Sequence, residues 1–365
     1  MRPVTPVAPR ALLGGPFLTS RHFWQNHHEA CQHGQHGYRF EKDGKQIGFV
    51  NLPLSVHEDA WGVVPIPLTV IKNGKGPTIL LQGGNHGDEY EGPIALGELI
   101  RDLDPASISG RLIIVPAINL PAVVAGRRTS PVDDLNLNRM FPGDHGGTIT
   151  AQIAAYISDV LFPMADVFVD LHSGGSSSVN MPSAAIEPAA DPAHFKRNID
   201  AVMAFDAPMV VIISNRGDPR TSTATAVRAG LTVVGTELAG GGTVSIEALA
   251  VVRRGLRNLL AHFGVLPPGE DGSSSVERPR IYEITPEAYV LATETGVFEP
   301  LHLNGAEVRA GQPAGRIHFL ANPGRAPETL HYRADGIVYV HRQPGQVRPG
   351  NVCMVVATPY RGQLP

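Results

Sequence analysis

Residues 78–103 read TILLQGGNHGDEYEGPIALGELIRDL, and this stretch decides the fold. The run from Thr78 to Leu81 is short and apolar, which is typical of a buried strand. A glycine-rich turn follows, and Ile94 to Leu103 repeats apolar side chains at helical spacing, with Pro93 suited to the first helical turn. A strand that passes through such a turn into a helix is the unit of parallel α/β sheets.

The same alternation continues from about residue 40 to 266 and predicts an α/β fold, with a mostly parallel or mixed sheet and helices on both faces. Further strands are expected at Trp61–Ile71, Leu112–Pro116, Val167–Leu171, Met209–Ile213 and Leu231–Thr236. One further helix is marked by residues four apart, which are Ile149, Ile153, Ile157 and Leu161. Another begins with Ser245 as N-cap, ends at Gly264, and has on one side Ile246, Leu249, Leu256, Leu259, Leu260 and Phe263.

Composition divides the chain into four parts. Residues 1–36 are rich in Pro, Gly and His without hydrophobic period, so we expect a poorly ordered extension. Residues 37–266 form the predicted catalytic domain, and 267–279, PPGEDGSSSVERP, have the small and helix-breaking residues of a linker. Residues 280–365 form a predicted C-terminal β domain.

The C-terminal part contains a weak repeat of about 40 residues. Its matched pairs are Gly296 with Gly336, Gly305 with Gly345, Gly311 with Gly350, and Val308 with Val347. Short strands with glycine turns predict a small two-fold β structure that resembles the barrel-sandwich hybrid of lipoyl and biotinyl domains. No lysine stands at a hairpin tip, so we expect a structural role, either as a cap over the site or as an oligomer contact.

Charge and cysteine content exclude several classes of protein. The net charge of −4 over 365 residues, without any Lys/Arg-rich block, argues against nucleic acid or membrane partners. Cys31 and Cys353 match no metal or redox spacing, and the first 28 residues are broken by prolines, so we expect a soluble, cytoplasmic protein. The sequence allows a homo-oligomer. A histidine group in the extension is expected to bind metal only adventitiously, its members being His27, His28, His33 and His36.

The turn after the first quoted strand carries candidate metal ligands. His86 and Glu89 lie three residues apart, so an imidazole nitrogen and a carboxylate can converge on one cation, and zinc accepts such mixed ligands. An H-x-x-E spacing is common by chance, and the strand-turn-helix context is what favours a site here. In an open α/β sheet, ligands bind outside the carboxyl ends of the strands.

A second strand end, VFVDLHSGG at residues 167–175, completes the candidate site. His172 ends this strand and can join His86 and Glu89, which leaves a fourth coordination position for water, the pattern of a catalytic zinc site. Alone, His172 also fits an ordinary hydrogen-bonded histidine. Asp170 points to the same side and either orients a ligand or caps a turn.

A third strand end, VVGTELAGGG, places Glu237 above another apolar run with small residues after it. A carboxylate there can take a proton from water and deliver it to a leaving amine. Taken alone, Glu237 also fits a solvated loop acid. Its position beside two other marked strand ends favours the catalytic role.

The loop GRRTSPVDDLNLNRMFPG, residues 126–143, offers groups that can bind a substrate anion. Asn138 and Arg139 combine an amide donor with a planar guanidinium, which suits a carboxylate. Arg128 is a candidate for stabilising charge on the scissile carbonyl oxygen, and Arg127 for an ordinary surface charge.

HGDE, NLNR, DLH and TEL occur in this order and resemble the motifs of the succinylglutamate desuccinylase and aspartoacylase family, within the zinc-carboxypeptidase-like superfamily. The resemblance covers roughly residues 45–358. It implies one zinc held by His86, Glu89 and His172, and Glu237 as the catalytic carboxylate. It also implies carboxylate binding by Asn138 with Arg139, and a carbonyl-polarising role for Arg128.

Three longer stretches are similar to the branch of N-alpha-acetyl-L-2,4-diaminobutyrate deacetylases of ectoine breakdown. They are AWGVVPIPLTVIKNGKGPT, GGNHGDEYEGPIAL and TELAGGGT followed by RRGLRNLL. This likeness implies hydrolysis of a small N-acyl amino acid with a free side-chain amine. Asp133 and Asp134 are candidates to bind that ammonium, by charge and proximity to the motif alone. The alternatives are a deacylase of another amino acid, a metallocarboxypeptidase, and a ligand-binding protein without catalysis.

Overall fold

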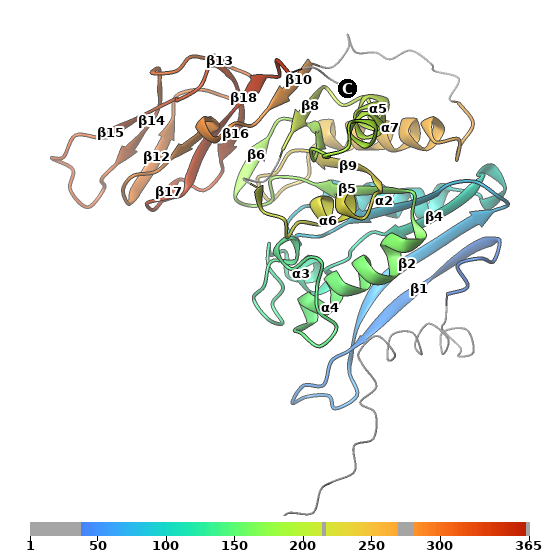
Figure 1. Ribbon diagram of the computed structural model, residues 1–365. Helices are drawn as coiled ribbons and strands as arrows, with labels where there is room; N and C mark the ends of the chain where they lie inside the picture. The colour runs from blue at the N-terminus through green and yellow to red at the C-terminus, as the bar shows by residue number, and fades with distance from the viewer. Residues whose placement is uncertain (1–37, 214–216, 269–279, 363–365) are drawn as a thin grey trace, which may run out of the picture. The chain divides into compact units, whose positions relative to one another are not determined.

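A computed structural model describes residues 38–213, 217–268 and 280–362 of the chain, and the fold below is that of the unit beginning at Phe40. Its largest sheet runs in the following spatial order: β1 (Gly44–Pro53), β2 (Val63–Asn73), β4 (Gly110–Val115), β3 (Thr78–Gly83), β5 (Val167–His172), β9 (Thr232–Glu237), β7 (Ser183–Ile186), β8 (Met209–Ile212), β10 (Arg280–Glu283), β18 (Val352–Pro359), β16 (Gly336–Arg342) and β13 (Glu307–Val308) (Figure 1). In addition, β11 (Tyr289–Leu291) pairs with β18, and β6 (Ser178–Asn180) pairs with β16.

The sheet is mixed. Strands β4, β3, β5 and β9 are parallel neighbours, whereas β1 with β2, β2 with β4, and β7 with β9 pair antiparallel. The α/β prediction is therefore confirmed, and the mostly parallel arrangement holds at the centre of the sheet. The six predicted strands are present with small shifts at their ends. Strand β1 was not predicted. Its apolar residues Ile47 and Phe49 are exposed instead of facing a core.

Helices lie against both faces of the central strands (Figure 1). On one face lie α2 (Glu91–Asp102), α5 (Pro192–Phe205) and α7 (Ile246–His262), whose apolar side chains share a core with alternate residues of β5. On the other side lie α3 (Leu120–Ala125), α4 (Ile149–Tyr156) with its π-helical continuation Ile157–Leu161, and α6 (Ser222–Arg228). Short 3-10 turns occur at Pro105–Ser107, Leu137–Arg139, Phe162–Met164 and Pro286–Ala288.

The predicted start of α7 is confirmed, because the Ser245 hydroxyl accepts a hydrogen bond from the Ala248 amide. One residue expected on the apolar side of that helix, Ile246, is not buried. Ile246 is 87% exposed, since the first turn of α7 extends beyond the core, which includes Ala248 but not Ile246.

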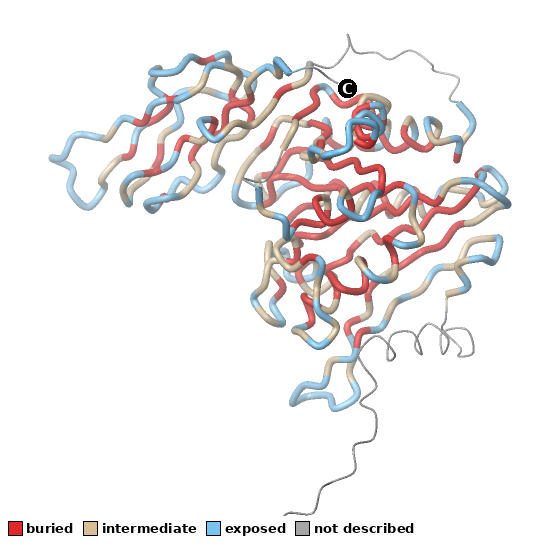
Figure 2. The backbone as a smooth tube through the Cα atoms, in the orientation of Figure 1, coloured by how far each residue is buried: buried red, intermediate tan, exposed pale blue. Residues whose placement is uncertain are grey.

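A second sheet follows in the C-terminal part. It contains β15 (Glu328–His331), β14 (Pro313–His318), β12 (Gly296–Pro300) and β17 (Gln346–Val347). Its core residues Phe298 and Ile317 pack in one cluster with Val338 and Val356 of the large sheet. Buried segments alternate with exposed ones along the strands of this part (Figure 2). The predicted repeat appears in the pairing, because Gly296 lies opposite Val347 and Gly336 opposite Val308.

The boundary between the two predicted domains is bridged by strand pairing. Strand β8 pairs in parallel with β10, which in turn pairs with β18, so the large sheet continues into the C-terminal part. The extension at 1–36, with Cys31 and the four histidines, and most of the linker at 267–279 lie outside the described residues. Within the described ranges, no helix has both the length and the apolar character that a membrane crossing requires.

Candidate active site

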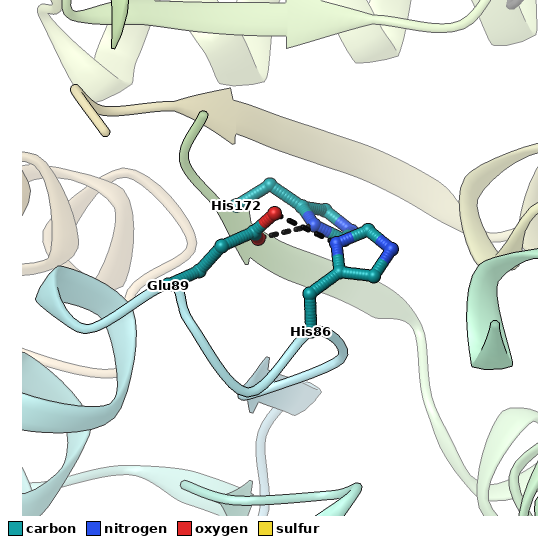
Figure 3. Close-up of side chains that lie close together, drawn as sticks. All are labelled: His86, Glu89 and His172. Carbon is teal, nitrogen blue, oxygen red and sulfur yellow. Dashed lines mark hydrogen bonds and ion pairs between the residues drawn. The ribbon is translucent and has the colours of Figure 1, made fainter. Parts of the chain in front are cut away.

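His86, Glu89 and His172 come together at the carboxyl ends of adjacent parallel strands. His86 and Glu89 lie in the turn between β3 and α2, and His172 is the last residue of β5. The Nδ1 atom of His86 is 2.7 Å from Glu89 Oε1, and the Nδ1 atom of His172 is 2.9 Å from Glu89 Oε2 (Figure 3). All three side chains are buried, and one potential ligand atom from each lies within 4.8 Å of the others.

The turn reaches this position because Gly87 packs directly against α3. A Cβ atom on Gly87 would lie 1.9 Å from the Ala122 carbonyl oxygen, so only glycine fits there. The Gly87 amide also donates to the Arg127 carbonyl at 2.8 Å. These contacts fix the segment that carries the two candidate ligands of the turn, His86 and Glu89.

The outer nitrogen of each imidazole has its own acceptor. Asn136 Oδ1 lies 3.1 Å from His86 Nε2, and Asp170 Oδ2 lies 3.1 Å from His172 Nε2. With a proton on each Nε2, both Nδ1 lone pairs face the point that Glu89 also faces. Asp170 is thus in the orienting position that the sequence allowed for it. It also accepts hydrogen bonds from Gln82 and from Ser222 of α6.

The charges in this cluster are strongly coupled. Burial opposes ionisation of Glu89, but the imidazoles of His86 and His172 hold the pKa of Glu89 well below its ordinary range. Burial also opposes protonation of His172, yet the carboxylates of Asp170 and Glu89 raise the pKa of His172 well above its ordinary value. Two carboxylates therefore favour positive charge at this position, which a divalent cation would supply in place of a proton.

Glu237 ends β9 directly beside His172, with which it pairs across the two strands. The side-chain amide of Asn180, on β6, donates a hydrogen bond to Glu237 Oε2. Burial, reinforced by the negative charge of Glu89, raises the pKa of Glu237 to about 8. A carboxyl group with a pKa near neutrality can both accept and release a proton under physiological conditions.

The loop residues predicted to bind a carboxylate lie at the same cavity. The Asn138 side-chain oxygen accepts from the Ser222 amide at 2.9 Å, which directs the Asn138 NH2 group towards His172. Arg139 Nε lies 3.3 Å from Asp218 Oδ2, and Arg128 Nη1 lies 3.4 Å from Glu89 Oε1. Both arginine side chains line the cavity, as does Asn138.

Three charged residues of this loop lie elsewhere. Arg127 is half exposed and pairs with Asp134 at 2.9 Å, in agreement with a surface role. Asp133 accepts from the amide and hydroxyl of Thr150 at 2.9 and 2.7 Å, at the start of α4. Neither aspartate is among the residues that line the cavity, and each carboxylate makes a local structural contact instead.

The cavity has a volume of about 410 Å³, and it is lined both by residues at the strand ends and by residues of the C-terminal part. Tyr289, Tyr339 and Arg342 contribute to its wall from beyond the linker. The Tyr339 hydroxyl lies 2.8 Å from Ser183 Oγ on β7, which joins the wall to the sheet. Sequence reasoning missed Asn136, although it stands two residues before Asn138 in NLNR, and it had no signal for the roles of Asn180 or Tyr339.

The chain is similar to known proteins over most of its length. The model of the succinylglutamate desuccinylase/aspartoacylase catalytic domain matches residues 75–263. The N-alpha-acetyl-L-2,4-diaminobutyric acid deacetylase of Halomonas elongata is 43% identical over 321 residues, which cover 87% of this chain and 93% of that protein.

Solved structures agree with this match. A succinylglutamate desuccinylase/aspartoacylase from Rhodobacter sphaeroides has a TM-score of 0.84 at 42% identity, covering 89% of this chain and 98% of that chain. The product-bound ectoine utilization protein EutE (DoeB) from Ruegeria pomeroyi has a TM-score of 0.84 at 41% identity, covering 88% and 97%. The similarity therefore extends through the C-terminal part as well as the catalytic sheet.

Proposed function

Because this chain belongs to the succinylglutamate desuccinylase/aspartoacylase family, a family of hydrolases of N-acyl amino acids, we propose that it removes the acetyl group from N-alpha-acetyl-L-2,4-diaminobutyrate. The products are L-2,4-diaminobutyrate and acetate. The observation that carries this proposal is the convergence of two imidazoles, Glu89 and Glu237 in one cavity, within a chain 43% identical to a deacetylase of that substrate.

Zinc is the metal that we propose for this site. Two imidazole nitrogens and one carboxylate suit zinc, and the acceptors on each Nε2 leave His86 Nδ1 and His172 Nδ1 as the ligand atoms. When bound, zinc would polarise the scissile carbonyl and lower the pKa of water to about 7. His86, Glu89 and His172 would hold one ion per chain.

The remaining residues account for the proton and the charge. The oxygen of a water molecule attacks the acetyl carbonyl carbon, and Glu237 accepts the proton that this water releases. The carbon–nitrogen bond then breaks, and Glu237 delivers the proton to the leaving nitrogen. Asn180 holds the Glu237 carboxyl, and Arg128 at the cavity wall stabilises negative charge on the carbonyl oxygen.

We propose that Asn138 and Arg139 bind the α-carboxylate of the substrate. Asn138 is oriented by Ser222, and Arg139 presents a guanidinium to the cavity. A cavity of about 410 Å³ suits a small acylated amino acid, because drug-sized ligands occupy pockets of roughly 300 to 1,000 Å³.

The C-terminal part acts in this proposal as a barrel-sandwich-like domain, residues 280–365, that caps the catalytic domain of residues 37–266. Support comes from Tyr289, Tyr339 and Arg342, which line the cavity. It also comes from the repeat, because strands of its first half pair with strands of its second half. We propose a cytoplasmic location, since the substrate is a small metabolite of amino-acid type.

A panel of N-acyl amino acids tests the function. We expect release of free amine from N-alpha-acetyl-L-2,4-diaminobutyrate to exceed release from N-acetyl-L-aspartate, N-succinyl-L-glutamate and a dipeptide series. Metal analysis by mass spectrometry of the same preparation should find about one zinc per chain. Faster cleavage of dipeptides would replace the proposal with a carboxypeptidase, and no cleavage of any compound would favour a binding protein.

A further inference from the structure

Strand β16 of the C-terminal part contains one extra residue, Tyr339, where it passes the cavity. Val338 pairs with Val356 of β18. The next paired residue of β16 is Val340, which pairs with Val355, so Tyr339 is an additional residue on the β16 side. In a regular strand, neighbouring side chains point to opposite faces, yet Tyr339 and Val340 both line the cavity. A bulge of this kind re-aims a side chain, and here it turns Tyr339 to the cavity.

The hydroxyl of Tyr339 bonds to the strand beside Glu237. Its oxygen lies 2.8 Å from Ser183 Oγ on β7. Ser183 is fully buried, and it pairs directly with Glu237 across β7 and β9. The single hydroxyl proton of Ser183 is donated to the Glu237 carbonyl oxygen at 3.5 Å, so the Tyr339 hydroxyl is the donor to Ser183. Two hydrogen bonds in series therefore connect β16 to the backbone of Glu237.

The phenol of Tyr339 keeps its proton in this position. Burial, reinforced by the negative charge of Glu237, raises the pKa of Tyr339 well above its ordinary value. Its hydroxyl proton is used by Ser183, which is not among the described residues that line the cavity. Tyr339 therefore acts on the site through Ser183 and not by donating a hydrogen bond to a substrate.

The same strand also supports the side-chain partner of Glu237. Asn180 of β6 pairs with Val340 of β16. The next residue of the chain, Met181, donates its backbone amide to the Tyr339 carbonyl oxygen at 3.0 Å. The side-chain amide of Asn180 in turn donates to Glu237 Oε2 at 2.5 Å. Strand β16 thus supports Glu237 at two points, which are its backbone and its carboxyl group.

We propose that Tyr339 is a positioning residue for proton transfer, because it holds the strand end that carries Glu237. This inference rests on the proposed function, in which Glu237 moves the proton. It gives the C-terminal part a role in catalysis beyond covering the cavity. A group that transfers a proton must be held within hydrogen-bond reach of the reacting atoms, so a looser strand end slows the chemical step.

The test removes each end of the hydrogen bond between Tyr339 and Ser183. Tyr339→Phe deletes the hydroxyl and keeps the ring in the wall of the cavity. Ser183→Ala deletes the acceptor on β7. Tyr282→Phe is the matched control, because Tyr282 belongs to the same buried cluster as Tyr339 and is not among the described residues that line the cavity.

Kinetics of the zinc-loaded enzyme with N-alpha-acetyl-L-2,4-diaminobutyrate give the main result. We expect Tyr339→Phe and Ser183→Ala each to lower kcat by about 3- to 10-fold, the range of one neutral hydrogen bond. KM should change by less than about twofold, because binding of the substrate is not affected. The double variant should lose no more than Ser183→Ala alone, since both changes remove the same hydrogen bond. Tyr282→Phe should change neither constant.

A second comparison separates positioning of Glu237 from a general structural effect. In a Glu237→Gln background, Tyr339→Phe should lower the remaining kcat by less than about twofold, because the group that Tyr339 positions no longer transfers a proton. A general loosening of the fold would lower kcat by the same factor in both backgrounds. The same factor in both would therefore overturn the proposal.

Two other results would also overturn it. A higher KM with unchanged kcat in Tyr339→Phe would show a direct contact with the substrate, and unchanged constants in both single variants would show that the hydrogen bond has no part in catalysis. In all these cases the wild-type enzyme still hydrolyses its substrate, so the proposed function stands. A wild-type protein that hydrolysed no N-acyl amino acid would refute the proposed function, and the role of Tyr339 with it.

Discussion

Replacing Glu237 with glutamine should change two measurable properties of the protein, which are the pH dependence of its stability and its catalytic rate. Burial and Glu89 raise the pKa of Glu237 from 4.5 to about 8, so the folded protein binds this proton more tightly than the unfolded chain does. Stability from this group is therefore fully present below about pH 4.5, is lost as the pH rises, and is gone above about pH 8. Glutamine has no charge and removes this dependence.

The size of the effect follows from the same shift. A difference of about 3.5 pH units corresponds to at most about 5 kcal/mol, at about 1.4 kcal/mol per unit. Relaxation of the cavity reduces this value. Between pH 5 and pH 8 we therefore expect the free energy of unfolding of metal-free wild type to fall by about 1 to 3 kcal/mol more than that of metal-free Glu237→Gln. The hydrogen bond from Asn180 can persist, because glutamine retains an acceptor oxygen.

Urea titrations of the chelator-treated proteins at several pH values would measure the difference in the free energy of unfolding between wild type and Glu237→Gln. Glu58→Gln is the control for loss of an exposed carboxyl. Parallel pH curves for wild type and Glu237→Gln would refute the reasoning about burial. In the zinc-loaded enzyme, Glu237→Gln should lower kcat by roughly 100-fold or more, the order expected for a lost general acid-base. A near-normal kcat would remove Glu237 from proton transfer.

Three further variants test the other parts of the site. His172→Ala should abolish zinc retention and hydrolysis together, because three protein ligands with one open position define such sites; stoichiometric zinc in the variant would exclude His172 as a ligand. Arg139→Ala should lower kcat/KM by at least about 30-fold, since a truncated charge pair costs about 2 to 5 kcal/mol. Amidating the substrate carboxylate should then cause little additional loss in the variant. If amidation lowered kcat/KM equally in wild type and in the variant, Arg128 would be the next candidate for binding the carboxylate. Asn136→Ala should weaken zinc affinity by about 10- to 100-fold in a competition with a chelator, and an unchanged affinity would show that His86 needs no outer acceptor.

Much of the site was predictable because it lies at strand ends. The two strands that end in a candidate ligand or catalytic residue are short, mostly apolar runs with an ionisable side chain as the last residue, which is His172 in β5 and Glu237 in β9. Parallel strands bring such ends to one edge of the sheet, so position along the chain translated directly into proximity in space. The candidate ligands His86 and Glu89, in the turn after β3, were predicted by the same rule.

The residues that the prediction missed depend on chain segments that meet only in three dimensions. Asp133 and Asp134 are close to the motif along the chain, yet their carboxylates are used by Thr150 and Arg127. Glu187 lies about 50 residues further on and reaches the cavity because β7 runs antiparallel to β9. No periodicity marks such a residue, since its position in the cavity wall depends on the pairing of strands.

The central α/β sheet, the cluster of His86, Glu89 and His172, and the positions of the main helices could all be predicted from the amino-acid sequence. Local hydrophobic periodicity and strand-end chemistry encode these features, and both can be read from consecutive residues. Two features become visible only in the folded chain. The sheet continues through β10 into the C-terminal part, and Asn180, Tyr339 and Glu187 lie in the cavity wall. These depend on long-range pairing, in which the partner of each strand is chosen by the packing of the whole chain.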